Sequence, residues 1–291
     1  MPIFRIKNSK AQQITIKSNH FKLEEELHVF FEKNLEELLG LRLLEHKYDT
    51  QGSGIPDTLA IDESNNPVII EYKLEQDSNV LVQGLSYFSW LEKNSKHFEL
   101  LVHEKINKDI KVNWDNPRII LIARGFDNRT ISAVKAVDNV ELYKYVPYNQ
   151  DIFYLENIYN PNGGQILKEK RIIENTDKVY DINYHIGDLN KEIQKIFYNL
   201  QEQVKLLPEV EEVINQKSGI TYRTTKSFSR FEFGRSYIRV LVKDYKYNDP
   251  KNLVRDITSF KWGYKGEIKI NSIKETNDVF ELIKQSYEST L

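Results

Sequence analysis

A short and almost entirely apolar segment, residues 118–123 (RIILIA), constrains the fold of this chain more than any other stretch. A strand of this composition is typical of a sheet that is buried on both faces. Strand-like and helix-like patterns alternate along the chain up to about residue 157. The sequence therefore predicts an α/β domain in the first half, with a mixed sheet flanked by helices.

Two amphipathic helices are expected in that half, over residues 20–40 and 77–93. Apolar side chains of the first recur at helical spacing, and Gly40 stands where helices commonly end. The acids at positions 24, 25, 26 and 32 line its other faces, and solvent exposure is the ordinary interpretation of such residues. In the second helix Gln83 and Tyr87 are four residues apart and therefore lie on one face.

Residues 54–73 (GIPDTLAIDESNNPVIIEYK) show the pattern of two short strands joined by a polar turn. Side chains alternate faces along a strand, so Glu71 and Lys73 share one face. A loop centred on Ser64 would place Asp57 directly across from Glu71, with their Cβ atoms about 4.5–5.5 Å apart. The hairpin therefore predicts two facing carboxylates with a lysine beside them.

Two carboxylates at that separation repel each other unless a cation lies between them, and a hard divalent ion with oxygen ligands would remove the conflict. Lys73 would point at whatever such a metal holds. A Glu-x-Lys sequence alone occurs on many strands that have one solvent-exposed face. Here, however, Glu71 and Lys73 flank a tyrosine on an otherwise apolar strand, which an exposed face does not explain.

The residues of this hairpin and of the helix after it resemble the PD-(D/E)XK nuclease superfamily, in particular its NucS-like and RecB-like branches. The resemblance covers about residues 1–157 and implies a restriction-endonuclease-like fold. It rests on the order G-x-x-D, E-x-K and Q-x-x-x-Y, carried by Gly54, Asp57, Glu71, Tyr72, Lys73, Gln83 and Tyr87. It implies metal-dependent hydrolysis of phosphodiester bonds.

By the same resemblance, Asp57 and Glu71 would bind Mg²⁺ or Mn²⁺, helped by a backbone carbonyl near Tyr72. Lys73 would orient the attacking water and stabilise the negative charge that develops on phosphorus. Both roles are implied by the family and are expectations for this chain.

Three further residues complete the expected site. Gln83 would hold Lys73, the water or the phosphate. Tyr87 would support Gln83 or contact the nucleic-acid backbone, although an aromatic residue on an amphipathic helix is as readily a core residue. Glu24, on the preceding helix, is a candidate extra metal ligand or supporting partner. The six histidines lack the spacing of paired metal ligands and read as structural or surface residues.

The second half of the chain predicts an α+β domain with an antiparallel sheet, over residues 185–291, after a polar linker at 158–184. A helix is expected over residues 188–207, a short second helix from Pro208, strands near 220–226, 229–233 and 237–243, and a final helix from Thr276. This half resembles a poorly characterised domain that follows such nucleases in bacterial proteins, at 231–233, 252–257, 262–263 and 282–287. The pattern of that domain predicts a histidine before Trp262. This chain has Lys261 at that position and so departs from the pattern.

Basic and aromatic residues share one face of a predicted strand in this half: Arg235, Tyr237, Arg239 and Lys243. Such a face could stack bases and pair with phosphates. The alternatives are an ordinary solvated face, a site for a protein partner, or a homodimer contact.

Composition sets the outer limits on function. The 41 Lys and Arg residues nearly balance the 43 Asp and Glu residues, so net charge neither supports nor excludes nucleic-acid binding. No cysteine is present, which removes disulfides, thiolate ligands and thiol nucleophiles. No apolar run is long enough to span a membrane and the first residues lack a signal-peptide core. We therefore expect a cytoplasmic protein without a membrane partner.

These observations together predict a DNA endonuclease that depends on Mg²⁺ or Mn²⁺, acting in repair or in defence by family analogy. Two alternatives stay open. The chain could be a catalytically silent module with a nuclease fold that binds nucleic acid or a protein, or it could be a nuclease directed at RNA.

Overall fold

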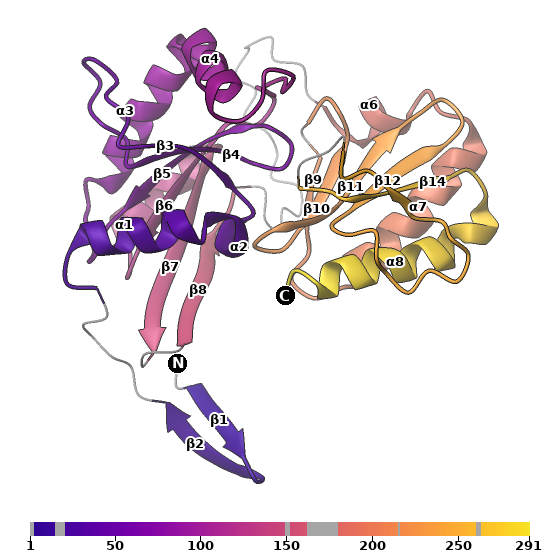
Figure 1. The fold of residues 1–291 in the computed structure, drawn as a ribbon, viewed down its shortest axis with the longest axis horizontal. Coiled ribbons are helices and arrows are strands. Elements are labelled where there is room, and N and C mark those ends of the chain that lie inside the picture. The colour runs from indigo at the N-terminus through magenta and orange to yellow at the C-terminus, as the bar shows by residue number, and fades with distance from the viewer. Residues whose placement is uncertain (1–2, 15–20, 149–151, 162–179, 215, 260–262) are drawn as a thin grey trace. The chain divides into compact units, whose positions relative to one another are not determined.

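The structure, a computed structural model, describes residues 3–14, 21–148, 152–161, 180–214, 216–259 and 263–291. The chain divides into two compact units, Met1–Pro161 and Asn162–Leu291 (Figure 1). The last strand of the first unit reaches Tyr159, beyond the expected limit at residue 157. Most of the expected linker, together with Lys261 and Trp262, lies outside the described residues.

The first unit contains the predicted mixed sheet, which has six strands in the order β3-β4-β5-β6-β7-β8. The central strands β5, β6 and β7 are parallel, whereas β3, β4 and β8 are antiparallel to their neighbours. The strands are β3 (Arg42–His46), β4 (Thr58–Ile61), β5 (Pro67–Tyr72), β6 (Arg118–Ala123), β7 (Val140–Tyr148) and β8 (Ile152–Tyr159). The segment RIILIA is buried along its whole length, as its composition predicts.

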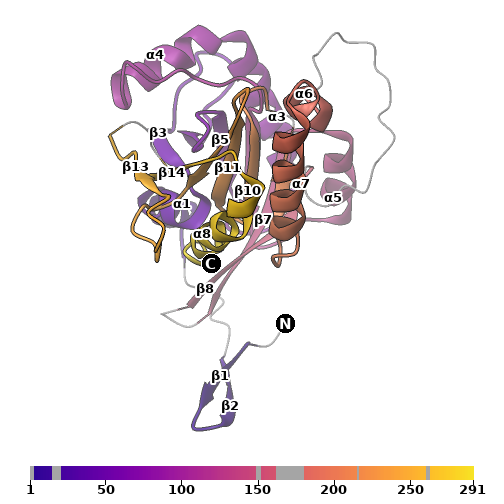
Figure 2. The same cartoon turned by 90° about the vertical axis from the view of Figure 1, so that its right-hand side faces the viewer.

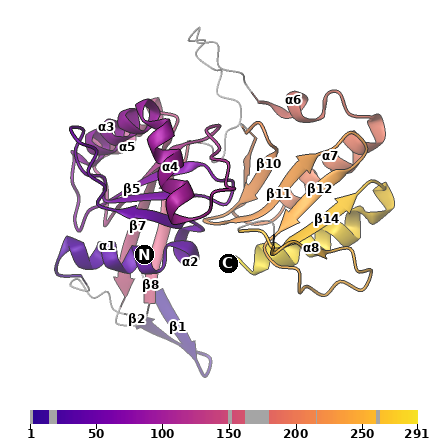
Figure 3. The same cartoon turned by 45° about the horizontal axis from the view of Figure 1, so that its top comes forward.

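Helices cover both faces of this sheet. Val68, Ile70 and Tyr72 of β5 face the core formed with α1 (Glu24–Lys33) and α2 (Leu35–Leu39). Ile69 faces the opposite core. That side carries α3 (Val80–Lys93), α4 (Ser95–Lys105), α5 (Asn128–Ala133) and the 3₁₀ turn η1 (Val134–Ala136) (Figure 3). The alternation of side chains along β5 therefore places neighbouring residues in different cores.

The expected continuous helix over residues 20–40 is wrong in two respects, because the helix begins at Glu24 and because Asn34 divides it into α1 and α2. Asn34 has φ −120° and ψ 18°, outside helical geometry. Its side-chain amide donates to the carbonyl of Phe30 at 2.7 Å, a local bond that competes with the helical ladder. Gly40 ends α2 in the left-handed region at φ 66°, as predicted.

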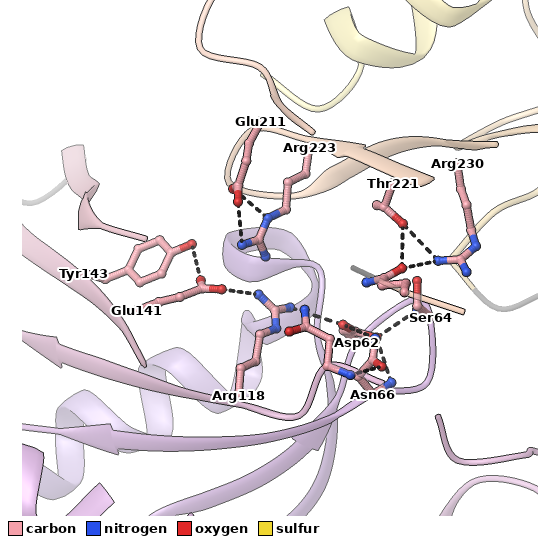
Figure 4. A network of polar contacts seen from close by, with 12 residues as sticks. Asp62, Ser64, Asn66, Arg118, Glu141, Tyr143, Glu211, Thr221, Arg223 and Arg230 are labelled. Carbon is pink, nitrogen blue, oxygen red and sulfur yellow. Dashed lines mark hydrogen bonds and ion pairs between the residues drawn. The ribbon is translucent and has the colours of Figure 1, made fainter. Parts of the chain in front are cut away.

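A buried ion network holds the turn between β4 and β5. Arg118, the first residue of β6, lies 2.8 Å from Glu141 and 3.5 Å from Asp62 (Figure 4). Asp62 in turn accepts bonds from the backbone and side-chain nitrogens of Asn66. Because the carboxylates compensate the guanidinium, the charges are tolerated inside the fold. The network fixes the end of the hairpin opposite to Asp57 and Glu71.

The second unit is an antiparallel sheet of six strands in the order β13-β14-β12-β11-β10-β9, which matches the predicted α+β class. Its helices are α6 (Ile182–Ile186), α7 (Lys191–Lys205) and α8 (Thr276–Glu288), with the 3₁₀ turn η2 (Ile273–Glu275) before α8 (Figure 2). The core of this unit joins α7 and α8 to one face of the sheet. The strands are β9 (Glu211–Val213), β10 (Ile220–Arg223), β11 (Ser227–Phe233), β12 (Ile238–Val242), β13 (Arg255–Asp256) and β14 (Gly266–Ile270).

The expected helix from Pro208 is wrong, because the chain forms the edge strand β9 there. Glu209 has φ 56°, a left-handed conformation that a right-handed helix cannot contain. The strand then pairs with β10, with Val213 opposite Thr221. Sheet pairing therefore overrides the helix-starting preference of proline.

The helices of the described ranges are all too short or too polar to cross a membrane.

Candidate active site

The carboxylate pair lies at the carboxyl end of β5. The register pairs Thr58 with Ile70, which confirms the prediction that Asp57 lies opposite Glu71. The backbone N–H of Asp57 donates to Oε1 of Glu71 at 3.1 Å. Lys73 follows β5 directly, and its N–H donates to the carbonyl of Ile122 on β6. The site therefore occupies the edge at which the parallel strands end, a common position for ligand sites in α/β sheets.

Both carboxylates are largely removed from solvent. Glu71 is 2% exposed, and the side chain of Asp57 is 14% exposed. Oδ2 of Asp57 accepts the N–H of Tyr72 at 3.0 Å. Burial, together with the nearby charge of Asp57, raises the pKa of Glu71 to about 9. Glu71 therefore holds a proton at neutral pH unless a cation compensates the pair.

Lys73 faces the same site and has an acidic partner from α1. Its Nζ lies 3.5 Å from Oε1 of Glu24, and Oε2 of Glu24 accepts the N–H of Leu74 at 3.2 Å. Burial acts to lower the pKa of Lys73, but the charges of Glu24, Asp57 and Glu71 outweigh it and raise the pKa. Lys73 therefore stays a cation, and the structure brings Glu24 to the place that the sequence could only suggest.

Gln83 and Tyr87 both lie on α3. The Oε1 atom of Gln83 is buried without a hydrogen-bond partner in the described part of the chain. An orphaned buried acceptor is costly and uncommon, and such atoms often belong to sites that a ligand or an ion completes. The Oε1 atom of Gln83 is thus available to accept a hydrogen bond, and the role expected for Gln83 stays a prediction.

Tyr87 belongs to the hydrophobic core and also borders the site. It packs with Leu59 and Ile69, and a Cβ atom on Gly54 would lie 2.7 Å from its ring. Burial, then the charge of Glu71, raises the pKa of Tyr87. The ring therefore lies between the core and the loop that contains Gly54. Tyr87 can accordingly be both a core residue and a neighbour of the site.

His28 is the residue near the site that sequence reasoning missed, because it was grouped with the structural histidines. It lies on α1, is 3% exposed, and places Nε2 at 3.6 Å from Oδ2 of Asp57. Its ring packs against Tyr72 with centroids 4.9 Å apart. Neither ring nitrogen has a hydrogen-bond partner among the described residues. The sequence does contain a signal that could have identified His28. This residue stands one helical turn after Glu24, beside the apolar side chains of the same helix.

Glu32 corrects the interpretation of the α1 acids as uniformly solvated. Its side chain is 10% exposed. Its Oε1 accepts the hydroxyl of Thr58 at 2.7 Å and lies 2.8 Å from Nδ1 of His46. Glu32 therefore ties α1 to β3 and to the start of β4, directly beside Asp57.

The donor set fits a divalent cation with few protein ligands. Within the described ranges, no group of three or more His, Asp and Glu side chains is arranged to hold a metal. Mg²⁺, however, is commonly bound by one or two carboxylates, with water and substrate phosphate filling the other positions. Asp57 and Glu71 supply such a pair, and the burial and mutual repulsion that raise the pKa of Glu71 would favour a cation between them.

The basic face expected in the second unit is largely engaged within that unit. Arg239 lies 3.2 Å from Glu232 on β11 and 3.5 Å from Glu267 on β14. Figure 4 also draws two further pairs of this unit, Arg223 with Glu211 and Arg230 with Thr221. The charge of Arg239 is therefore balanced by carboxylates of its own sheet.

The other members of the expected face differ in exposure and position. Nζ of Lys269 lies 5.3 Å from the ring centroid of Tyr237, and Nζ of Lys243 lies 5.4 Å from the ring centroid of Tyr264. Arg235 is exposed in the turn before β12. A nucleic-acid role for this face stays a prediction.

Comparison with known proteins places the chain beside one full-length relative. No family model matches it. A curated protein of Haemophilus influenzae, described only as uncharacterized, is 29% identical over 303 residues, which are 98% of this chain and 99% of that protein.

Two solved structures resemble part of the chain. A repair endonuclease from Pyrococcus abyssi has a TM-score of 0.28 and 16% identity, over 43% of this chain and 48% of that one. The EndoMS–dsDNA2 complex has a TM-score of 0.28 and 15% identity, over 48% of this chain and 63% of that one. The chain thus spans less than two thirds of either protein. Likeness of this extent does not decide function, which has to be argued from the site.

Proposed function

We propose that this chain is a metal-dependent endonuclease that hydrolyses phosphodiester bonds of DNA. The observation that carries the proposal is the buried pair of Asp57 and Glu71, which face each other with Lys73 alongside. Burying two adjacent carboxylates costs stability unless a cation is recruited. A buried pair of this kind favours a divalent cation, and with it the phosphate that the cation binds.

The roles follow from charge and position. Asp57 and Glu71 would hold Mg²⁺ or Mn²⁺. The metal would supply Lewis acidity toward the phosphate and would lower the pKa of bound water. Lys73, kept protonated by Glu24, would orient the attacking water and stabilise the negative charge that develops on the phosphate oxygens. Gln83 would accept a hydrogen bond from Lys73 or from the water through its orphaned Oε1.

Cleavage of supercoiled plasmid and of labelled single-stranded DNA, with and without Mg²⁺ or Mn²⁺, tests the proposal. Glu71→Gln and Lys73→Met should each lower the cleavage rate by about 100-fold or more, the scale of losing one electrostatic catalytic group. Glu92→Gln and Lys93→Met are matched controls, because both residues are exposed on α3. If the two site variants cut as fast as the controls, the assignment of the site is wrong.

The same assay separates the rival functions. A matched RNA digested faster than the DNA would make the chain an RNA nuclease. DNA binding that survives in all variants, while no preparation ever cleaves, would make it a binding module with a nuclease-like site.

A further inference from the structure

The first residues of the chain form a β-ribbon that the candidate active site does not use. Strands β1 (Ile3–Lys7) and β2 (Lys10–Ile14) pair antiparallel in a two-stranded sheet of their own. Asn8 and Ser9 form the tip, with φ of 49° and 58°. Two central residues with positive φ are typical of the tight turn that suits a twisted hairpin. We call residues 3–14 the N-terminal ribbon.

Among the ribbon side chains that the structure describes, only Ile14 is buried, so little core stabilises the N-terminal ribbon. All residues from Phe4 to Gln13 are exposed, and Phe4 and Ile6 are 51% and 79% exposed. An isolated two-stranded ribbon is only marginally stable in water. The exposed apolar side chains and the small core therefore favour a surface that is completed by a partner.

The two faces of the ribbon differ in chemistry. Residues directly opposite each other share a face, so Lys7 and Lys10 lie side by side, next to Arg5. Phe4 and Ile6 share the other face. Like charges directly opposite each other destabilise a strand pair unless an anion lies between them. The Lys7–Lys10 pair thus favours an anionic partner.

The surrounding sequence strengthens this charge bias. The first 23 residues contain five basic residues and no acidic residue, although the whole chain has a net charge of −2. These residues therefore carry a local net positive charge. Such a local cluster attracts a polyanion even when the total charge is slightly negative.

We propose that the N-terminal ribbon is an arm that binds duplex DNA, which deepens the proposed function and rests on it for the identity of the partner. A two-stranded ribbon fits a DNA groove. Lys7 and Lys10 contact phosphates. Because Phe4 and Ile6 lie on the opposite face, the ribbon enters the groove edge-on, and these two side chains contact the sugars of the other groove wall. The arm holds the duplex while the Asp57–Glu71 site acts on the strand.

The test measures binding of a fluorescent 30-base-pair duplex by the full chain in EDTA, so that cleavage does not interfere, across a range of KCl concentrations. Each lost phosphate contact lowers the slope of log affinity against log salt by about 0.9. Lys7→Gln/Lys10→Gln should therefore lower the slope by about 1.8. Phe4→Ser/Ile6→Ser should weaken binding about tenfold with the slope unchanged, because no phosphate contact is lost.

Lys96→Gln/Lys108→Gln is the matched control, since it removes the same charge from exposed positions outside the ribbon. An unchanged slope in the ribbon lysine variant, or an equal change in the control, overturns the proposal. Tighter binding of a matched RNA duplex also overturns it. So does ribbon-dependent binding to vesicles of anionic phosphatidylglycerol with unchanged DNA affinity, because the arm then serves a membrane.

Cleavage distinguishes failure of the arm from failure of the active site. The ribbon variants should keep the maximal Mg²⁺-dependent cleavage rate and raise only the DNA concentration needed to reach it. Ribbon-dependent DNA binding without any cleavage would leave the arm in place and refute the nuclease. Cleavage by a protein whose DNA binding does not depend on the ribbon would refute the arm and leave the nuclease in place.

Discussion

At the scale of single residues, one electrostatic conflict dominates this molecule. Asp57 and Glu71 are held against each other by the backbone of the hairpin, with their charges largely out of solvent. The fold relieves the conflict by keeping a proton on Glu71, whose pKa burial and Asp57 raise to about 9. A bound cation would relieve it by another route, at the expense of that proton.

The first prediction is a pH-dependent gain in stability in Glu71→Gln. The folded pKa of Glu71 lies above its ordinary value of 4.5. The unfolded state therefore binds fewer protons, and wild-type stability falls as pH rises from about 4.5 through 9. The neutral glutamine avoids this loss. In EDTA at pH 8.5, the melting temperature of Glu71→Gln should exceed that of the wild type. The difference between the two proteins should be at least about 3 °C larger at pH 8.5 than at pH 5.

An equal difference at the two pH values would contradict the raised pKa. Adding Mn²⁺ gives a second measurement. It should raise the melting temperature of the wild type more at pH 8.5 than at pH 6.5, because binding requires the ionised carboxylate, and should do little in the glutamine variant.

The second prediction concerns His28, whose buried ring nitrogens have no hydrogen-bond partner among the described residues. His28→Ala would leave a cavity beside Tyr72 and should cost about 2–4 kcal/mol of unfolding free energy. His28→Leu fills the space and leaves no polar atom unsatisfied, so it should cost less than about 1.5 kcal/mol. Urea unfolding of the two variants checks the contrast, and equal large losses would mean that the ring makes a polar contact that stabilises the fold.

At the scale of elements, the loop before β4 is fitted to helix α3. Gly54 has φ +100°, and a side chain there would meet the ring of Tyr87 at 2.7 Å. The neighbouring Thr50 N–H donates to the carbonyl of Gly54 at 3.1 Å, which closes the loop. The loop and α3 together therefore fix the direction in which the chain enters β4 at Asp57.

The third prediction is that Gly54→Ala disturbs both stability and the site. The left-handed backbone and the contact with Tyr87 should together cost about 1–3 kcal/mol, and cleavage should fall because Asp57 is displaced. Gly125→Ala is the control, since a Cβ there meets nothing within 4 Å. Thermal melting and cleavage rates of the two variants test this, and equal behaviour would show that the loop accommodates a side chain.

At the scale of the whole molecule, the chain consists of two units with separate hydrophobic cores. Among the described residues, the core of the second unit is formed by side chains between Ile182 and Tyr287, from its helices, its antiparallel sheet and the loops that join them. A domain with its own core can in principle fold alone.

The fourth prediction is that residues 180–291 fold without the first unit. The isolated segment should unfold in one cooperative transition in urea, with far-ultraviolet circular dichroism and tyrosine fluorescence giving the same midpoint. Transitions that do not coincide, or a baseline without cooperativity, would mean that the second unit depends on the first.

The sequence by itself determined the mixed α/β class of the first unit and the register of its central hairpin. Both follow from local rules. Apolar runs mark buried strands, and the alternation of side chains together with the length of the turn fixes which residues face each other. Asp57 could therefore be placed opposite Glu71 from the residues alone.

Only the tertiary structure decided which distant segments meet. Glu24 reaches Lys73, and His28 reaches Asp57, because α1 packs on the face of β5 that carries Tyr72. The pairing of β9 with β10 is also a product of tertiary structure. No local period encodes such contacts, because they depend on the order of strands and on which helix covers which face.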